Sequence, residues 1–456
     1  MPLQKNQVFT LRVERLSSDG SGVAHSPDGE TVFIPGAAPG DEARVRIVKD
    51  CKRYAFGILD EVLTPSPDRI PVDCAVAGPC GGCSLRHLDY AAELRAKQEN
   101  VADAFARIGG LDVPVLPIVG SPEVNRYRNK VQFPVGVDKS GKPCIGFYAG
   151  RTHRIVPCPD CRLQPGVLNE IGNALCAFFA EKGIQPYSEE TGRGLVRHIF
   201  LRRGAHSGQI MVCLVCTRAK LPSAEELCTR LKAQFAEITT ILLNVNAKNT
   251  NVILGTETHT LYGPGYIEDT LCGVPVQLGP LSFYQVNTLA AEQLYGIAAQ
   301  YAQLTPDDLL LDLYCGMGTI GLSMAAHCRE LIGVEIVPEA IESAKANAAR
   351  MGADVAAKSR FFCADAGQAA TRLAAEGLHP DIVMLDPPRK GCDEATLSAA
   401  VRMFPRRVVY VSCNPATAAR DAAWLEQNGY HAEKVQPVDL FPRTRHCECV
   451  LSFSKV

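Results

Sequence analysis

Residues 309–322 read LLLDLYCGMGTIGL, an apolar run that leads directly into a G-x-G-x-x-G pattern. An almost continuous apolar run is typical of a strand buried on both faces of a parallel sheet. The three glycines allow a tight turn and a close approach of the backbone to a ligand at the N-terminus of the following helix. The pattern alone fits a dinucleotide site equally well, and it also fits a strand–helix turn that binds no ligand.

Four more apolar runs follow along the chain, separated by alanine-rich stretches of helical character. Each is of the length expected for a buried strand. The alternation from about residue 278 onward predicts a doubly wound α/β domain. The runs are LIGVE (331–335), RFFCAD (360–365), DIVMLD (381–386) and VVYVS (408–412).

The N-terminal part of the chain has a different pattern. Residues 3–62 contain five short alternating segments separated by Gly, Pro and Asp turns, which predicts a small β-barrel of the oligonucleotide-binding type. A proline-rich linker, LTPSPDRIPV (63–72), follows. Residues 90–109 predict a helix, and residues 121–270 predict a mixture of strands and helices.

Composition places the chain among ordinary globular proteins. It has 456 residues, 46% of them hydrophobic and 21% charged. The N-terminus lacks the layout of a signal peptide, and no apolar stretch approaches the roughly 18 residues needed to cross a bilayer. We therefore expect a cytoplasmic protein whose nineteen cysteines are reduced.

The net charge of −2 does not indicate a nucleic-acid binder, but the charge is unevenly distributed. Residues 121–203 carry 13 Lys and Arg against 7 Asp and Glu. Such a segment could follow a phosphate backbone, or it could simply supply solvated strand faces. The basic residues include Arg126, Arg128, Lys130, Arg151, Arg154, Arg197, Arg202 and Arg203.

Glu335 ends the next predicted strand, about twenty residues on, where a carboxylate can accept hydrogen bonds from both ribose hydroxyls. Two further features favour S-adenosylmethionine over a dinucleotide as the ligand of the glycine loop. Asp312 lies just before the glycines, and the fourth strand ends in Asp386-Pro387-Pro388. Two consecutive prolines restrict that loop, which could hold a substrate base beside a transferable methyl group.

An Asp-Pro-Pro loop alone would indicate methylation of an exocyclic amino group. Methylation at C5 of a pyrimidine needs more, because a thiolate must first add to C6 and a base must later remove the C5 proton. Cys413 ends the fifth predicted strand and precedes Asn414-Pro415, which we expect to begin a helix. A helix N-terminus would favour its thiolate, although a buried structural thiol would fit the same position.

The required carboxylate is found near the C-terminus, in FPRTRHCECVLSFS (441–454). If this segment is a strand, His446 and Glu448 face one side while Cys447 and Cys449 face the other. A carboxylate within an apolar strand is unusual. It could serve as the base, or it could form an ion pair at the edge of a sheet.

With these motifs the chain resembles the RNA (uracil-5-)-methyltransferase family over nearly its whole length, in particular the cluster-containing ribosomal RNA branch. The resemblance implies a class I methyltransferase domain, with Cys413 as nucleophile and Glu448 as proton-abstracting base. It also implies a TRAM domain, an RNA-binding barrel, at residues 3–62. The residues implied to contact S-adenosylmethionine are Gln285, Tyr314, Glu335 and Asp386. The motifs are SFYQVN (282–287), DLYCGMGTIGL (312–322), GVE (333–335), LDPPRKG (385–391), VSCNPAT (411–417) and FPRTRHCE (441–448).

These predictions divide the chain into three domains. Residues 1–63 form the TRAM-like β-barrel, and residues 72–272 form a central α+β domain that holds a cysteine cluster and an RNA-binding surface. Residues 278–456 form the methyltransferase domain.

A cysteine cluster begins with Cys74, Cys80 and Cys83 in a Gly/Pro-rich loop. A fourth ligand could be Cys158 or Cys161. By spacing alone, Cys80 and Cys83 with the CxxC at 158–161 could bind zinc, whereas the first three with one distant cysteine could bind a four-iron cluster. The family resemblance favours a [4Fe-4S] cluster with Cys161 as the fourth ligand.

Three other functional classes fit less well. A radical S-adenosylmethionine enzyme needs Cys-x3-Cys-x2-Cys, but the first gap here has five residues. An amino-group methyltransferase would not need Cys413 and would carry an aromatic residue where Arg389 stands. A non-catalytic RNA-binding protein would not need the glycine loop together with Cys413 and Glu448.

The family branch also predicts the partner. We expect the substrate to be 23S ribosomal RNA rather than transfer RNA, because the transfer-RNA relatives generally lack the barrel and the cluster. We expect no DNA or membrane partner, and we expect a monomer.

Overall fold

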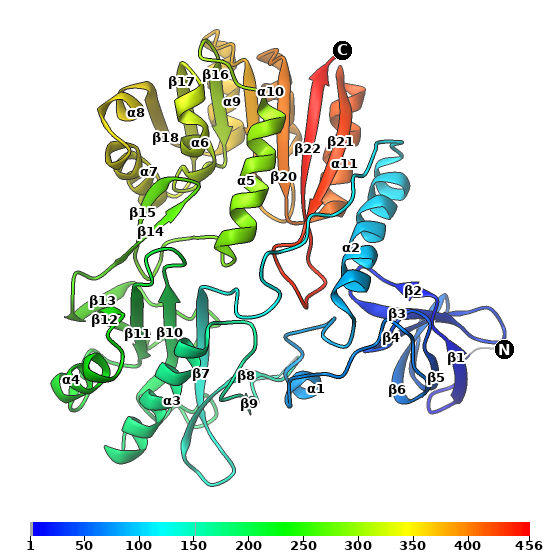
Figure 1. The fold of residues 1–456 in the computed structure, drawn as a ribbon, viewed down its shortest axis with the longest axis vertical. Coiled ribbons are helices and arrows are strands. Elements are labelled where there is room, and N and C mark those ends of the chain that lie inside the picture. Colours follow the sequence, from blue (N-terminus) through cyan, green and yellow to red (C-terminus); the bar gives the residue numbers. More distant parts are fainter. Residues whose placement is uncertain (1–2, 151) are drawn as a thin grey trace.

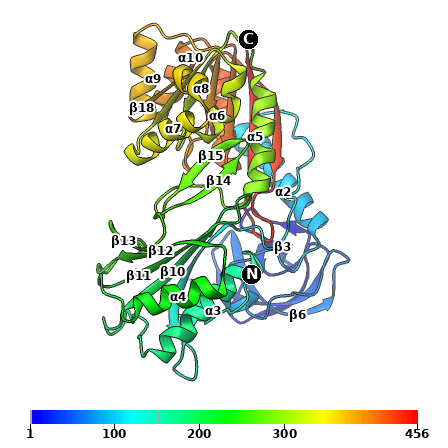
Figure 2. The same cartoon turned by 60° about the vertical axis from the view of Figure 1, so that its left-hand side comes forward.

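The computed structural model describes residues 3–150 and 152–456. Figure 1 shows a blue N-terminal barrel and a green central part side by side at one end, and the C-terminal sheet at the other. Figure 2 shows the same separation after rotation. Within the described residues, no helix is long and apolar enough to cross a membrane.

The N-terminal six-stranded sheet has the strand order β1-β5-β6-β4-β3-β2 and surrounds one small core. Alternate residues point inward, so that Val32, Ile34, Val45 and Ile47 are fully buried while their neighbours face outward. The segment was predicted to contain five strands, and the structure has a sixth, very short one. The strands are β1 (Val8–Arg12), β2 (Arg15–Leu16), β3 (Ser21–His25), β4 (Thr31–Pro35), β5 (Glu42–Asp50) and β6 (Tyr54–Thr64).

A short helix, α1 (Ala77–Cys80), and a long helix, α2 (Tyr90–Ala104), follow the linker. The Asp89 carboxylate caps α2 by accepting a hydrogen bond from Ala91 N at 3.0 Å. The helix continues as a π-helical turn, Phe105–Gly109, which confirms the predicted helix at 90–109. It packs on α11 (Pro415–Gln427), and Val101 is fully buried in the core of the C-terminal sheet.

The central sheet has the strand order β13-β12-β11-β10-β7-β8-β9. Helices α3 and α4 cover one face, and residues such as Phe200 and Leu242 on the other face join the core shared with the C-terminal part. The elements are β7 (Lys130–Val137), β8 (Pro143–Tyr148), β9 (Ile155–Pro157), α3 (Gly166–Glu181), β10 (Val196–Arg203), β11 (Ile210–Cys216), α4 (Ala224–Gln234), β12 (Ile238–Val245) and β13 (Glu257–Tyr262). The predicted central domain, residues 72–272, stays a prediction. Helix α2 lies within this range, but it packs with the C-terminal sheet.

The C-terminal sheet has the strand order β18-β17-β16-β19-β20-β22-β21, parallel except for β22. Its two faces contribute to two separate cores, as predicted for a doubly wound α/β domain. A hairpin of β14 (Ile267–Leu271) and β15 (Val274–Leu278) precedes it. The other elements are α5 (Thr288–Ala302), β16 (Leu309–Leu313), α6 (Thr319–Met324), the 3₁₀ turn η2 (Ala325–His327), β17 (Glu330–Glu335), α7 (Pro338–Arg350), α8 (Ala353–Lys358), β18 (Ser359–Cys363), α9 (Ala366–Ala375), β19 (Ile382–Leu385), α10 (Glu394–Arg402), β20 (Arg407–Ser412), β21 (Tyr430–Val438) and β22 (Glu448–Lys455).

Part of the expected basic surface is buried. Arg197 and Arg202 lie inside β10 with exposed fractions of 5% and 1%. Arg197 donates hydrogen bonds to the carbonyls of Asn246 and Lys248, and Arg202 to those of Gly279 and Ser282. These two arginines connect backbone segments and cannot follow a phosphate backbone, while Arg151 lies outside the described residues.

Candidate active site

The glycine loop lies at the point where the order of the parallel strands reverses, between β16 and β19. Open α/β sheets bind ligands at the carboxyl ends of the strands at such a point. Tyr314 leaves β16 with a φ of 66°, and Gly316 and Gly318 follow at 56° and 79°. These left-handed conformations turn the chain sharply into α6, and only glycine adopts them without strain.

Glu335 is fixed by three backbone amides. Its carboxylate accepts hydrogen bonds from Gly316 N at 3.2 Å, Ile336 N at 2.8 Å and Val337 N at 2.9 Å. The first of these amides belongs to the glycine loop and the others precede α7. The carboxylate is therefore oriented before any ligand is bound, at the end of the strand beside β16.

Asp312 lies beneath the glycine loop and is almost completely buried. Its Oδ2 accepts a hydrogen bond from Gly321 N at 3.0 Å, while its Oδ1 has no partner among the described residues. Burial, with a smaller contribution from Asp386, raises the pKa of Asp312 to about 8. A Cβ at position 321 would lie only 2.8 Å from Asp312 Oδ2, so the close approach requires glycine.

Asp386 and Gln285 lie near the same edge. Burial raises the pKa of Asp386 to about 7. The carbonyl of Gln285 accepts a hydrogen bond from Asn129 Nδ2 at 2.7 Å, and Asn129 N donates to Val286 O at 2.8 Å. The central part of the chain thereby positions Gln285 at the C-terminal sheet, although it lies outside the glycine loop.

Cys413 follows β20 at the position expected from the sequence, and Asn414 caps α11 by accepting a hydrogen bond from Ala416 N at 3.2 Å. The Asn414 side chain also donates to Arg389 O at 3.0 Å, and Thr417 Oγ1 donates to the same carbonyl at 3.3 Å. The Asp-Pro-Pro loop and the turn that carries Cys413 are thus joined.

The electrostatic environment of Cys413 differs from the expectation. Burial raises the pKa of the thiol to about 11, and Glu448 and Asp386 contribute to the shift, while Arg389 opposes it. The favourable effect of the helix N-terminus on the thiolate stays a prediction, and burial and the neighbouring carboxylates act against it.

Glu448 is the first residue of β22 and is 6% exposed. Burial, followed by Asp386, raises its pKa to about 8, and Arg389 opposes the shift. The strand predicted for residues 441–454 is shorter than expected, because 439–447 form a loop between β21 and β22. His446 therefore belongs to this loop. The predicted strand alternation, with His446 and Glu448 on one face, does not apply to His446.

A cavity of about 640 Å³ opens in front of Cys413. Its walls come from the N-terminal barrel, from α2, from the turn after β20 and from the loop before β22. The lining residues include Arg15, Phe33, Lys97, Arg389, Cys413 and His446. The cavity therefore joins segments from both ends of the chain, which the sequence patterns did not indicate.

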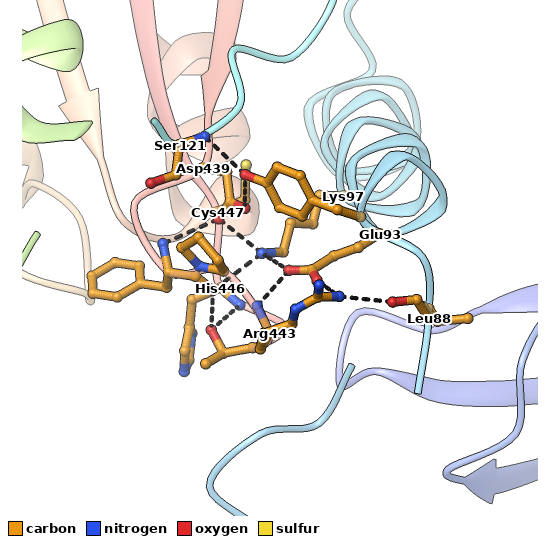
Figure 3. A network of polar contacts seen from close by, with 12 residues as sticks. Leu88, Glu93, Lys97, Ser121, Asp439, Arg443, His446 and Cys447 are labelled. Atoms are coloured by element: carbon orange, nitrogen blue, oxygen red, sulfur yellow. Dashed lines mark hydrogen bonds and ion pairs between the residues drawn. The ribbon is translucent and has the colours of Figure 1, made fainter. Parts of the chain in front are cut away.

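Helix α2 and the 439–447 loop are connected by a buried charge network (Figure 3). Lys97 Nζ donates hydrogen bonds to Glu93 Oε1 at 2.7 Å, Asp439 Oδ1 at 2.8 Å and Phe441 O at 3.2 Å. Glu93 and Asp439 are completely buried, and Lys97 is 1% exposed. Removing one member would leave a buried charge without its partner.

Arg443 extends the network on the other side of the loop. Its backbone N donates to Glu93 Oε1 at 2.7 Å, and its Nη1 donates to Leu88 O at 2.7 Å (Figure 3). Tyr90 OH donates to Asp439 Oδ2 at 2.9 Å. The contacts fix the segment that leads directly to Glu448, and sequence reasoning missed all of them.

The cysteines expected to bind a cluster lie near one another. Burial raises the pKa of Cys80, and the proximity of Cys161 and Cys74 adds to this effect. Cys83 is affected in the same direction by burial and by Cys161 and Cys80. Across 3–150 and 152–456, however, no group of three or more His, Cys, Asp and Glu is arranged closely enough to hold a metal ion.

Cys158 and Cys161 have different environments. A hydrogen bond from Cys158 lowers the pKa of Cys161 to about 6, whereas the pKa of Cys158 is raised. Arg86, which is 3% exposed, lies beside Cys83 and opposes the rise in its pKa. The Arg86 Nε and Nη2 groups have no hydrogen-bond partner within the described chain. Such unpaired donors fit an anionic group bound by these thiols.

Comparisons with known proteins place these features in context. The family model described as tRNA (uracil-5-)-methyltransferase matches residues 206–456, and the TRAM domain model matches residues 2–59. An uncharacterized RNA methyltransferase of Halalkalibacterium halodurans is 43% identical over 98% of this chain and 97% of its own length. One of Bacillus cereus is 41% identical over 100% of this chain and 98% of its own.

A solved structure is similar over the same extent. The tRNA (uracil-54, C5)-methyltransferase of Pyrococcus abyssi, in complex with S-adenosyl-L-homocysteine, has a TM-score of 0.78 and 27% identity. The similarity covers 98% of this chain and 100% of that protein. It therefore includes the barrel as well as the C-terminal sheet.

Proposed function

This chain belongs to the tRNA (uracil-5-)-methyltransferase family, and we propose that it methylates C5 of a uridine in RNA through a covalent adduct formed by Cys413. Its enzymatic class is S-adenosylmethionine-dependent RNA methyltransferase. The observation that carries the mechanism is the placement of Cys413 directly after β20 and of Glu448 at the start of the neighbouring strand β22, where Glu448 and Asp386 both raise the pKa of the Cys413 thiol.

The methyl donor would bind at the carboxyl edge of β16, β17 and β19, where the residues present fit it. Glu335 is held in position to accept hydrogen bonds from ribose hydroxyls, and the glycines leave the backbone open to a ligand. Tyr314, Gln285 and Asp386 would complete the site. When bound, S-adenosylmethionine supplies an electrophilic methyl group.

In the proposed reaction, the thiolate of Cys413 adds to C6 of the uracil ring and electron density moves onto C5. C5 would then form a bond to the methyl group of a bound S-adenosylmethionine, whose S–CH3 bond would break to leave S-adenosylhomocysteine. Glu448 removes the C5 proton, the C5–C6 double bond re-forms, and the bond between C6 and Sγ breaks to regenerate the thiolate. The carboxylate must be ionised to accept that proton, and its buried position keeps water away from the transfer.

Replacement of Glu448 by Gln tests this assignment. We expect the variant to transfer the methyl group and then to retain the RNA covalently, because no base removes the C5 proton. A protein–RNA band on a denaturing gel measures the adduct, with the exposed Glu342→Gln as the matched control. Normal turnover with no such band in Glu448→Gln would contradict the role of Glu448.

We propose 23S ribosomal RNA as the substrate, on the basis of the family branch with a barrel and a cysteine cluster. A second candidate, transfer RNA, has specific support, because the similar Pyrococcus abyssi enzyme is a tRNA (uracil-54, C5)-methyltransferase. The likeness to that enzyme covers 98% of this chain, so the presence of a barrel does not separate the two candidates.

Mapping of 5-methyluridine in both RNA classes decides between them. Cells with the protein, without it, and with a Cys413→Ala variant in its place are compared. Loss of one 23S position in the last two supports the proposal. Loss confined to transfer RNA supports the second candidate, and no loss in either class contradicts the proposed reaction.

We propose that Cys74, Cys80, Cys83 and Cys161 hold a [4Fe-4S] cluster. The electrostatic proximity of Cys161 to Cys80 and Cys83 and the unpaired donors of Arg86 support this set. Such a cluster, when bound, would connect the 74–83 loop to the central part of the chain. Iron and sulfide content after anaerobic purification tests it: Cys161→Ser should lose both, and Cys158→Ser should retain them.

We further propose that the protein acts as a monomer in the cytoplasm. All nineteen cysteines are free, which suits a reducing compartment. Light scattering of the purified protein, with and without RNA, measures the oligomeric state.

A further inference from the structure

The N-terminal barrel has three aromatic rings on its outer face. Phe33 in β4 and Phe56 in β6 are paired in register, and Tyr54 lies two residues before Phe56. Their sequence neighbours Val32, Ile34 and Ala55 point into the barrel and are fully buried. The alternation of the strands therefore directs all three rings away from the core.

The rings form one group. The centroids of Phe33 and Tyr54 are 5.6 Å apart, those of Tyr54 and Phe56 5.7 Å, and those of Phe33 and Phe56 5.9 Å. Tyr54 is 40% exposed, and the other two rings are half-buried. Isolated exposed apolar side chains are common on protein surfaces, whereas a contiguous exposed group indicates a binding site.

The aromatic group is continuous with the cavity in front of Cys413, because Phe33 is also part of the cavity wall. The cavity wall that includes Phe33 carries four arginines against two carboxylates, those of Asp19 and Asp103. Arg15 and Arg107 share one carboxylate, that of Asp103, at 3.0 and 3.3 Å. Arg389 and Arg445, which also line the cavity, are exposed. A polyanion that enters the cavity would therefore pass over this part of the barrel.

We propose that Phe33, Tyr54 and Phe56 form a stacking site for an unpaired nucleobase of the substrate RNA, on a nucleotide that flanks the target uridine. This inference rests on the proposed function for the identity of the target. Proteins recognise single-stranded RNA by combining a basic groove with aromatic side chains on which unstacked bases lie. The arginines supply the first element here and the three rings supply the second.

The test uses the full-length protein and uridine oligoribonucleotides that carry a single 2-aminopurine at successive positions. Fluorescence quenching reports stacking of that base, and titration gives the affinity. Removal of an aromatic stacking partner lowers affinity by about 5- to 150-fold per base. Phe33→Leu, Tyr54→Leu and Phe56→Leu should each lower affinity by at least about fivefold and abolish quenching at one position.

Two controls separate stacking from other effects. Tyr54→Phe keeps the ring and should retain quenching and affinity, and Ile58→Ala changes a 46% exposed side chain on the same strand and should have no effect. The slope of log affinity against log salt should stay unchanged in the leucine variants, because stacking releases no counterions. Wild-type affinity in all three leucine variants, or a reduced salt slope, would overturn the proposal.

Measurement of 5-methyluridine in the same samples separates this inference from the proposed function. If binding and quenching depend on the rings but no RNA is methylated, the stacking site stands and the proposed reaction fails. If the leucine variants methylate RNA as the wild type does at subsaturating concentrations, the stacking site fails and the reaction stands.

Discussion

The glycine-loop edge and the cavity in front of Cys413 are built in opposite ways. The first is local: Tyr314 and Asp386 directly follow strands of one sheet, and Glu335 ends another. Backbone amides at most 19 residues away orient Glu335. The second is assembled from the barrel, α2, the turn after β20 and the 439–447 loop. The difference implies that binding of the methyl donor should survive changes that eliminate the reaction at the RNA.

Cys413→Ala should give the largest difference between an effect on the reaction and an effect on cofactor binding. We expect the loss of the nucleophile to reduce methyl transfer by at least about 10⁴-fold, as for nucleophiles of other enzymes. Affinity for S-adenosylhomocysteine, measured by calorimetry, should stay at the wild-type value. Cys363→Ala, at an exposed cysteine of the same sheet, serves as the control. Activity in Cys413→Ala comparable to the wild type would contradict the assignment.

A substitution in the buried charge network of α2 and the 439–447 loop should also affect the second region more than the first. Lys97→Met leaves Glu93 and Asp439 buried without their shared cation, which should lower the free energy of unfolding by about 3–5 kcal/mol. Methylation should fall because the 439–447 loop loses its support. Lys345→Met, at an exposed ion pair, should cost less than about 1 kcal/mol. Equal effects of the two substitutions in denaturant titrations would refute this account of the network.

The pH dependence of kcat/KM should depend on Cys413 and Glu448, which belong to the second region. Glu448 must lose a proton to act as a base, and Cys413 must lose one to act as a nucleophile, and both have a raised pKa. The value of kcat/KM should therefore rise steeply between pH 6 and pH 8, by about 100-fold through Cys413 and about 50-fold through Glu448, or roughly 5,000-fold together. In Glu448→Gln, adduct formation should still rise with pH through Cys413 but lose the inflection near 8. A rate that falls over this range is incompatible with these roles.

The smallest effect is expected at the glycine-loop edge. Glu335→Gln keeps the shape of the side chain but removes its charge, so affinity for S-adenosylhomocysteine should fall by about tenfold. Affinity for RNA, measured by filter binding, should be unchanged. Glu339→Gln, in the first turn of α7, should change neither. If RNA binding falls as much as cofactor binding does, the two regions are not independent.

The local region could be predicted from the sequence because its determinants lie close together in the chain. The apolar runs that end in Tyr314, Glu335 and Asp386 are strands, and the G-x-G-x-x-G pattern lies where it was expected. Cys413 also follows a strand and precedes a helix. The family and the fold class were identified from these motifs, and the comparisons confirm both.

The charge network, the buried arginines and the environment of Cys413 could not be predicted, because they depend on contacts between distant segments of the chain. Glu93 and Lys97 are spaced like an exposed i,i+4 pair, yet both are buried by a loop that lies about 340 residues away. Arg197 and Arg202 contribute to a basic composition but bind backbone carbonyls. The raised pKa of Cys413 arises from Glu448 and Asp386 as well as from burial, and neither carboxylate is near it in sequence.

The same network has a consequence for synthesis of the protein. Lys97 and Asp439 are 342 positions apart, so at roughly 5–20 residues per second the ribosome needs about 20–70 s to supply the second after the first. During that time Glu93 and Lys97 on α2 can pair with each other but not with Asp439 or the Arg443 backbone. The barrel, which is complete by residue 64, can fold while translation continues. The cavity in front of Cys413 can form only after residues 445–447 have been synthesised, because they supply part of its wall.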